Sequence, residues 1–74
     1  MGEVSIESDV TGAVWKILVE VGSSVAAGDP LLIMESMKME IPIESTVAGT
    51  VSAMMVQQED VVEEGQIVAV IATG

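Results

Sequence analysis

One lysine is the residue best placed to do chemistry in this chain. The sequence has two basic side chains against twelve acidic ones, and Lys38 lies within residues 35–40, which read Glu-Ser-Met-Lys-Met-Glu. A lysine amine is a nucleophile that can be acylated when it is presented to a partner. Without His, Cys or Arg, the chain has no usual general base near pH 7, no thiol and no guanidinium. We therefore interpret it as a chain that presents an amine, and not as an enzyme.

The sequence is a tandem duplication, and Lys38 lies between the two copies. With an offset of 37 residues, Glu3–Met37 aligns with Glu40–Gly74. Several equivalent positions are identical in type, namely Val10/Val47, Gly12/Gly49, Val14/Val51, Val19/Val56, Val25/Val62 and Gly28/Gly65. A solenoid needs about three stacked units or more, so two short copies are better interpreted as halves of one domain over residues 1–74.

Composition and apolar alternation predict an all-β fold. Hydrophobic residues make up 50% of the chain, with many β-branched side chains and Trp15 as the only aromatic. With no Cys to form a disulfide, the core must carry the fold. We expect four strands in each copy and no helix. The predicted strands are residues 4–8, 13–21, a short piece around Val25, 31–35, 40–45, 49–57, a short piece around Val62, and 67–72.

Three finer expectations follow from the sequence. Buried positions change phase between Val14 and Ile17, and again between Val51 and Met54, which predicts a β-bulge at the same place in each copy. A closed or nearly closed sandwich would hide the strand edges of so small a domain. We expect Met34, Met54 and Met55 to fill the core or lie just beneath the surface.

Only a tight turn fits between the strands that meet at Lys38. Two-residue hairpin loops favour Asn-Gly, Asp-Gly or Gly-Gly, because the tightest turns need positive φ. Here the central pair is Met37-Lys38, which breaks that rule. Local rules are most often broken where function overrides them, so we predict that Lys38 is an exposed amine at a hairpin tip.

Charge and hydropathy exclude several classes of partner. A net charge of −10 argues against nucleic-acid and anionic-membrane binding, which need clustered cations. The acids can act as a solvated surface, as a field that steers basic partner enzymes, or as both, and their spacing matches no calcium loop. The longest apolar run, residues 67–72, is far shorter than the roughly 20 residues of a membrane span. With no basic leader before the repeat, we expect an intracellular, cytoplasmic protein.

Residues 35–40 resemble the biotin-attachment motif of the biotinyl domains in biotin-dependent carboxylases and transcarboxylases, usually written Glu-Ala-Met-Lys-Met. The similarity covers nearly the whole chain, because each copy also has a Gly-x-Val and a Val-x-x-Gly segment. These segments are Gly12–Val14, Val25–Gly28, Gly49–Val51 and Val62–Gly65. The resemblance implies a flattened β-barrel, or sandwich, of two four-stranded sheets related by a quasi two-fold axis, with the modified lysine on a hairpin at one end.

The resemblance also implies roles for the residues of the motif. Lys38 takes the position of the covalently biotinylated lysine, with Met37 and Met39 as its usual neighbours. Glu35 matches the acidic residue that opens the motif, whereas Ser36 departs from the commoner Ala. We assign partner recognition to Glu35, Ser36 and Glu40. The chain has no insertion that could form the thumb loop of some bacterial carriers, so it resembles a minimal biotinyl domain.

Three partners are implied in the same way. A biotin protein ligase would form biotinyl-AMP and transfer biotin to Lys38, a biotin carboxylase would carboxylate the cofactor, and a carboxyltransferase would receive the carboxyl group. The alternatives are a lipoyl domain, an unmodified barrel-sandwich interaction module and a small enzyme. Lipoyl domains typically carry Asp-Lys-Ala where this chain has Met37-Lys38-Met39. An intact attachment motif disfavours the interaction module, and the chain offers no catalytic constellation for an enzyme.

Overall fold

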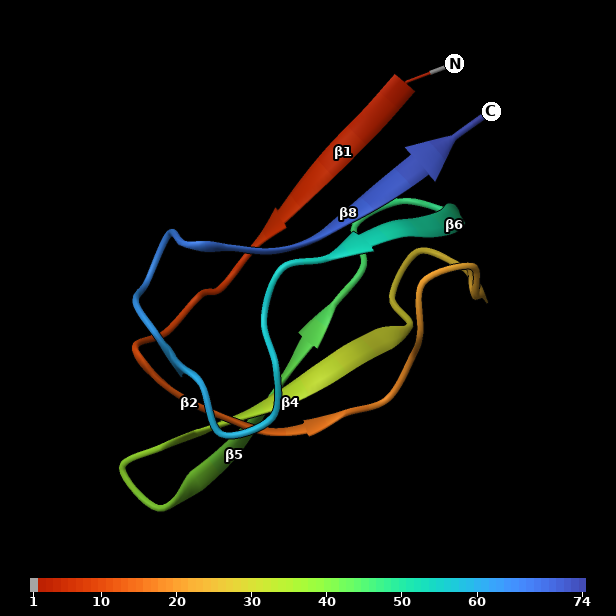
Figure 1. The fold of residues 1–74 in the computed structure, drawn as a ribbon. Helices are drawn as coiled ribbons and strands as arrows, with labels where there is room; N and C mark the ends of the chain where they lie inside the picture. The colour runs from red at the N-terminus through yellow and green to blue at the C-terminus, as the bar shows by residue number, and fades with distance from the viewer. Residues whose placement is uncertain (1) are drawn as a thin grey trace.

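Eight β-strands form the computed structural model, which describes residues 2–74 (Figure 1). The strands are β1 (Gly2–Glu7), β2 (Gly12–Ile17), β3 (Ser24–Val25), β4 (Pro30–Ser36), β5 (Met39–Glu44), β6 (Gly49–Met54), β7 (Val61–Val62) and β8 (Ile67–Thr73). All pairings between them are antiparallel. Within residues 2–74 no helix is long and apolar enough to cross a membrane.

The strands form two four-stranded sheets that repeat the duplication of the sequence. One sheet has the order β1-β8-β6-β3 and the other β5-β4-β2-β7. Shifting each strand of one copy by 37 residues gives the bounds of its counterpart, so that β1 becomes β5 and β4 becomes β8. The same exchange converts the order of one sheet into that of the other. The predicted all-β architecture of two four-stranded sheets is confirmed, as a flattened sandwich and not as a closed barrel.

The core between the sheets obeys the same symmetry. Six pairs of equivalent residues are buried together, and they are Ile6/Ile43, Val14/Val51, Val25/Val62, Leu31/Val68, Leu32/Ala69 and Met34/Ile71. Ser8 and Ser45 are the equivalent buried polar pair, and each hydroxyl bonds to the backbone two residues ahead. Because each sheet takes strands from both copies, neither copy can bury its apolar face without the other.

The predicted bulges are confirmed, but the strands that contain them are shorter than expected. Register shifts occur between Val14 and Lys16 in β2 and between Val51 and Ala53 in β6. The predicted strands 13–21 and 49–57 were wrong beyond Ile17 and Met54, where β2 and β6 end. Val56 is nevertheless 4% exposed and packs into the core from a loop. The apolar pattern therefore predicted the burial of Val56 correctly, although this residue does not lie in a strand.

Three methionines expected in or near the core have different environments. Met34 is fully buried in β4, and Met54 packs against the core while partly exposed. The prediction for Met55 was wrong, because this residue follows the end of β6 and its side chain is 59% exposed. Trp15, the only aromatic residue of the sequence, is 44% exposed on β2.

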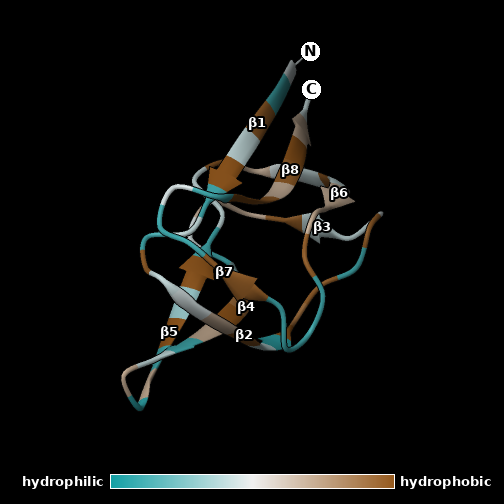
Figure 2. Cartoon of the chain, turned by 60° about the vertical axis from the view of Figure 1, so that its left-hand side comes forward, coloured by the Kyte–Doolittle hydropathy of each residue, from teal (hydrophilic) through white to brown (hydrophobic). Residues whose placement is uncertain are grey.

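The hairpin of β4 and β5 and the two chain ends lie at opposite ends of the molecule (Figures 1 and 2). Ser36 pairs with Met39 at the hairpin, and the equivalent pair in the other sheet is Thr73 with Gly2. The chain ends therefore occupy the position that the Lys38 turn occupies in the other half. This arrangement matches the one implied by the duplication.

Glu59 breaks the symmetry in one loop. Its φ is 77°, a left-handed conformation that favours glycine, and the equivalent residue of the first copy is Gly22 with φ of 97°. A Cβ at Gly22 would meet nothing within 4 Å, so substitution there costs conformational energy only. Glu59 therefore carries a strain that its counterpart avoids.

Replacing Glu59 by glycine should stabilise the protein. We expect Glu59→Gly to raise the free energy of unfolding by about 1 kcal/mol, because relief of left-handed strain exceeds the added entropy of the unfolded chain. The matched change Gly22→Ala should lower it by about 1 kcal/mol. Urea unfolding of both variants measures this difference. A less stable Glu59→Gly chain would show that the carboxylate contributes more than the strain costs.

Candidate functional site at the Lys38 hairpin

Lys38 occupies the second central position of a two-residue turn. Met37 has φ of 51° and Lys38 has φ of 67°, and the flanking residues Ser36 and Met39 are paired across the hairpin. Positive φ at both central positions is the type I′ turn, whose twist matches that of antiparallel strands. The hairpin predicted from the sequence is confirmed. Its central residues are not glycine or asparagine, so the turn carries strain of about 1–3 kcal/mol at each.

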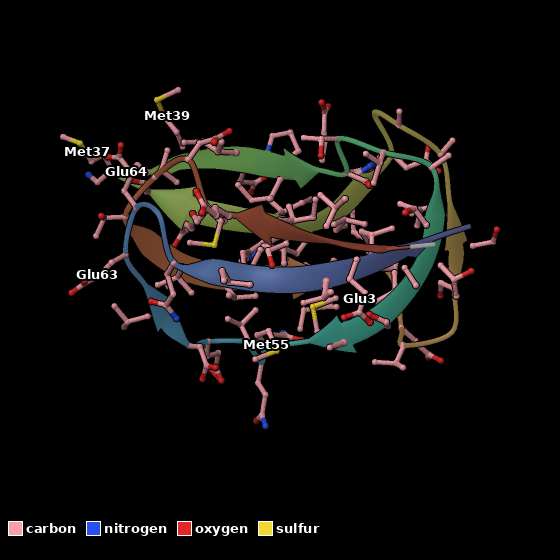
Figure 3. The ribbon with its side chains drawn as sticks, turned by 90° about the horizontal axis from the view of Figure 1, so that it is seen from above. Glu3, Met37, Met39, Met55, Glu63 and Glu64 are labelled. Carbon is pink, nitrogen blue, oxygen red and sulfur yellow. The ribbon has the colours of Figure 1, made fainter. Side chains whose placement is uncertain are left out.

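The turn places Lys38 in solvent between two exposed thioethers. The side chain of Met37 is 93% exposed and that of Met39 is 63% exposed. Lys38 is also exposed. Figure 3 shows both methionines projecting from the same end of the molecule. The amine is accessible from several directions, as a residue that enters a partner's active site must be.

The strands behind the turn hold it rigidly. β4 and β5 pair from Ser36/Met39 back to Pro30/Glu44, and Met34 and Ile43 on these strands are buried in the core. Gly12 of β2 lies so close to the hairpin that an added Cβ would collide with the carbonyl oxygen of Glu35. The glycine of the first Gly-x-Val segment thus lets β2 pack against the base of the hairpin.

A second contact at this base was not found from the sequence. The Ser36 hydroxyl donates to the carbonyl oxygen of Thr11 at 2.8 Å, and the Glu64 N–H donates to the Thr11 hydroxyl oxygen at 3.0 Å. We call this arrangement the Thr11 bridge. It joins the hairpin to the β1–β2 and β7–β8 connections. The bridge also gives Ser36, which departs from the commoner Ala, a partner for its hydroxyl.

The Thr11 bridge is present only at the Lys38 end. The residue equivalent to Thr11 in the second copy is Ala48, which has no hydroxyl. The residue equivalent to Ser36 is Thr73, and its hydroxyl donates instead to the carbonyl oxygen of Gly2. A comparison of the two copies for positions that differ would have identified Thr11. The added contacts fall at the end that presents the lysine.

Two of the predicted recognition residues face each other beside the turn. Glu35 and Glu40 are directly opposite in the β4–β5 ladder, and both are exposed. Like charges in this arrangement destabilise a hairpin, so the pair does not serve stability. Glu35 also lines a surface hollow of about 500 Å³, together with Ala13, Val14, Trp15, Gln58 and Glu59. A role for Glu35, Ser36 and Glu40 in recognition stays a prediction.

The geometry is compatible with a carrier of a covalently attached group. A rigid two-sheet scaffold holds one amine at an exposed turn, away from both chain ends. Among residues 2–74, no three acidic side chains are grouped so that they could hold a metal ion. The exposed Lys38 amine is a nucleophile within reach of a partner.

Comparison with known proteins gives the family. The family model described as "Biotin-requiring enzyme" matches residues 2–71. A "Biotinylated protein TB7.3 homolog" of Mycobacterium leprae is 39% identical over 67 residues, covering 90% of this chain and 94% of that protein. A "Biotin carboxyl carrier protein" of Streptococcus mutans is 40% identical, covering 92% of this chain and 52% of that one. The chain therefore belongs to the biotin/lipoyl attachment family.

A solved structure agrees in fold. The urea carboxylase of Kluyveromyces lactis superposes with a TM-score of 0.92 at 38% identity, over 97% of this chain and 6% of that one. A "Biotin/lipoyl attachment protein" of Bacillus subtilis is 34% identical, over 86% of this chain and 88% of that protein. Relatives of this chain thus occur both as part of a large carboxylase and as a protein of nearly the same length as this chain.

Breaking the Glu64 half of the Thr11 bridge should loosen the hairpin while the fold persists, although the bond from Ser36 to the Thr11 carbonyl remains. Thr11→Ala installs the residue that the second copy has naturally and deletes the bond from Glu64, at a cost of about 0.5–1.5 kcal/mol. We expect faster amide hydrogen exchange at residues 37–40 and a severalfold slower acylation of Lys38.

Two controls separate the bridge from general destabilisation. Thr11→Ser keeps the hydroxyl and should retain slow exchange. Thr73→Ala removes a hydroxyl at the opposite end and should leave residues 37–40 unchanged. Equal exchange at the hairpin in wild type and Thr11→Ala would contradict a positioning role for Thr11.

Proposed function

We propose that this chain is a biotin carboxyl carrier domain whose biotin is held by an amide bond to Lys38. The observation that carries the proposal is the exposed Lys38 at the strained turn within Glu-Ser-Met-Lys-Met-Glu, in a chain of the biotin/lipoyl attachment family. Related chains bear names such as biotin carboxyl carrier protein and methylcrotonoyl-CoA carboxylase. These names support biotin over lipoate, as do Met37 and Met39.

The residues of the turn fit an attached biotin. The exposed Lys38 amine would attack the acyl carbon of an activated biotin, form the amide and release a proton, with the activating group leaving as AMP. Met37 and Met39 flank the amine without proton chemistry of their own. Once attached, biotin would supply a ureido nitrogen that carries a carboxyl group. The β4–β5 ladder would keep the attachment point fixed while the arm moves.

The partners follow from this role. A biotin protein ligase would load Lys38, and a biotin carboxylase and a carboxyltransferase would use the arm in turn. Tethering raises the concentration of biotin at each active site far above that of the free cofactor. The net charge of −10 would steer the domain toward basic surfaces around those sites. We place the domain in the cytoplasm, as expected from the sequence.

Biotin should be attached to Lys38 and to no other residue. Lys38→Arg keeps the charge but removes the usable amine, so avidin capture and the biotin mass increment should both disappear after incubation with ligase, ATP and biotin. The chain provides its own control, because Lys16→Arg changes the other lysine and should be labelled fully. Labelling should change the net charge from −10 to −11. Equal capture of wild type and Lys38→Arg would exclude the proposed site.

The flanking methionines should matter more for carboxyl transfer than for labelling. Thioethers are flexible and polarizable and can fit several partner surfaces, whereas Leu has a similar volume but less adaptability. We expect Met37→Leu and Met39→Leu to be biotinylated normally and to support carboxyl transfer a fewfold more slowly in a reconstituted assay.

Met55→Leu is the matched control for these variants. Met55 is exposed like Met39 but lies far from the hairpin (Figure 3), so its replacement should affect neither reaction. Biotin incorporation and transfer are measured on the same preparations. If transfer by the Met37→Leu and Met39→Leu variants matches wild type, or if only their labelling falls, the methionines do not have this role.

A further inference from the structure

The methionines of this protein differ sharply in access to solvent. Met37 is 93% exposed, Met39 is 63% exposed and Met55 is 59% exposed, whereas Met34 is fully buried. Two of these exposed thioethers flank the single lysine of the turn, and the third lies on a different part of the surface (Figure 3). The protein thus contains exposed methionines beside Lys38, an exposed methionine away from it and a buried methionine.

We propose that Met37 and Met39 are a hydroperoxide-sensitive modification site, and that their oxidation slows the acylation of Lys38. The inference rests on the proposed function, because it concerns the step that attaches biotin. The oxidant is a small hydroperoxide, such as hydrogen peroxide or an alkyl hydroperoxide. The product is methionine sulfoxide on one or both sides of the amine.

The reaction needs only access to sulfur. A sulfur lone pair attacks the outer oxygen of the hydroperoxide, the O–O bond breaks as an S–O bond forms, and water or an alcohol leaves with the proton. Sulfur loses two electrons and the hydroperoxide gains them. Met37 and Met39 offer their sulfur atoms to solvent, whereas the closed core around Met34 excludes the oxidant. The exposed pair should therefore react well before Met34.

The oxidised side chains should leave the fold intact. Neither Met37 nor Met39 belongs to the buried core, and the turn is fixed by the pairing of Ser36 with Met39 and by the strands behind it. Sulfoxide formation changes polarity without removing a core contact. The effect is therefore expected on recognition of the turn and not on the stability of the domain.

Loading, the attachment of biotin to Lys38, is the step that oxidation of the flanking methionines should slow. During acylation the amine itself must enter the ligase active site, so the ligase surface approaches the turn to within about one lysine side chain, which has four methylene groups. The side chains beside Lys38 then lie in or next to that interface. A sulfoxide oxygen placed there loses water, and an unpaired polar group in a dry contact is costly.

The test oxidises the protein before biotin is attached. Unmodified protein is treated with hydrogen peroxide, catalase removes the excess, and peptide mass spectrometry counts the added oxygen at each methionine, about 16 Da per sulfoxide. Ligase, ATP and biotin are then added, and the initial rate of biotin incorporation is measured by intact mass. We expect oxygen on Met37 and Met39 and not on Met34, with loading slowed at least about fivefold. Methionine sulfoxide reductases A and B together should restore the rate.

Matched variants assign the effect. A Met37→Leu/Met39→Leu chain still oxidises at Met55 but should load at the same rate with and without peroxide. A Met55→Leu chain should behave like wild type.

Different results separate the two proposals. If untreated protein is never biotinylated, the proposed function fails. If untreated protein loads normally, the oxidation inference is overturned by any of three results: unreacted Met37 and Met39 under conditions that oxidise Met55, unchanged loading with both sulfoxides present, or equal slowing in the Met37→Leu/Met39→Leu chain.

Discussion

Mutual burial of two similar halves is the constraint on which the rest of the structure depends. Each sheet contains strands of both copies, and the core consists of equivalent residues from each. Half a domain of this size has too little apolar area to offset its chain entropy. The copies must therefore fold together, and the segment between them must reverse the chain direction within very few residues. The lysine turn is that segment, so its position is a consequence of how the core closes.

The same closure supports a strained turn. Met37 and Lys38 both have left-handed backbones that glycine or asparagine would adopt at lower cost. The turn persists because the ladder behind it, the close approach of Gly12 and the Thr11 bridge fix the two strands that it connects. Two residues without the backbone freedom of glycine thus occupy positions where glycine or asparagine would be expected. The stability of the sheet is sufficient to hold them.

Much of this arrangement could be predicted because the duplication allows equivalent positions of the two copies to be compared. Matching residues placed the strands, both bulges and the hairpin that exposes Lys38. The ends of β2 and β6 were missed because Val19 and Val56 keep an apolar rhythm after the backbone has left the sheet. Met55 was misjudged because Met is apolar yet tolerant of solvent. The role of Thr11 was not predicted because its partners, Ser36 and Glu64, are 25 and 53 residues away in the sequence.

The placement of the chain ends affects how the domain works when it is joined to something else. Both ends emerge opposite the lysine, and the longest dimension of the molecule is 37 Å. A protein or label fused at either end would therefore be held away from the turn by the body of the domain. The folded domain then adds its own length to the distance between the fusion point and any group attached at the turn.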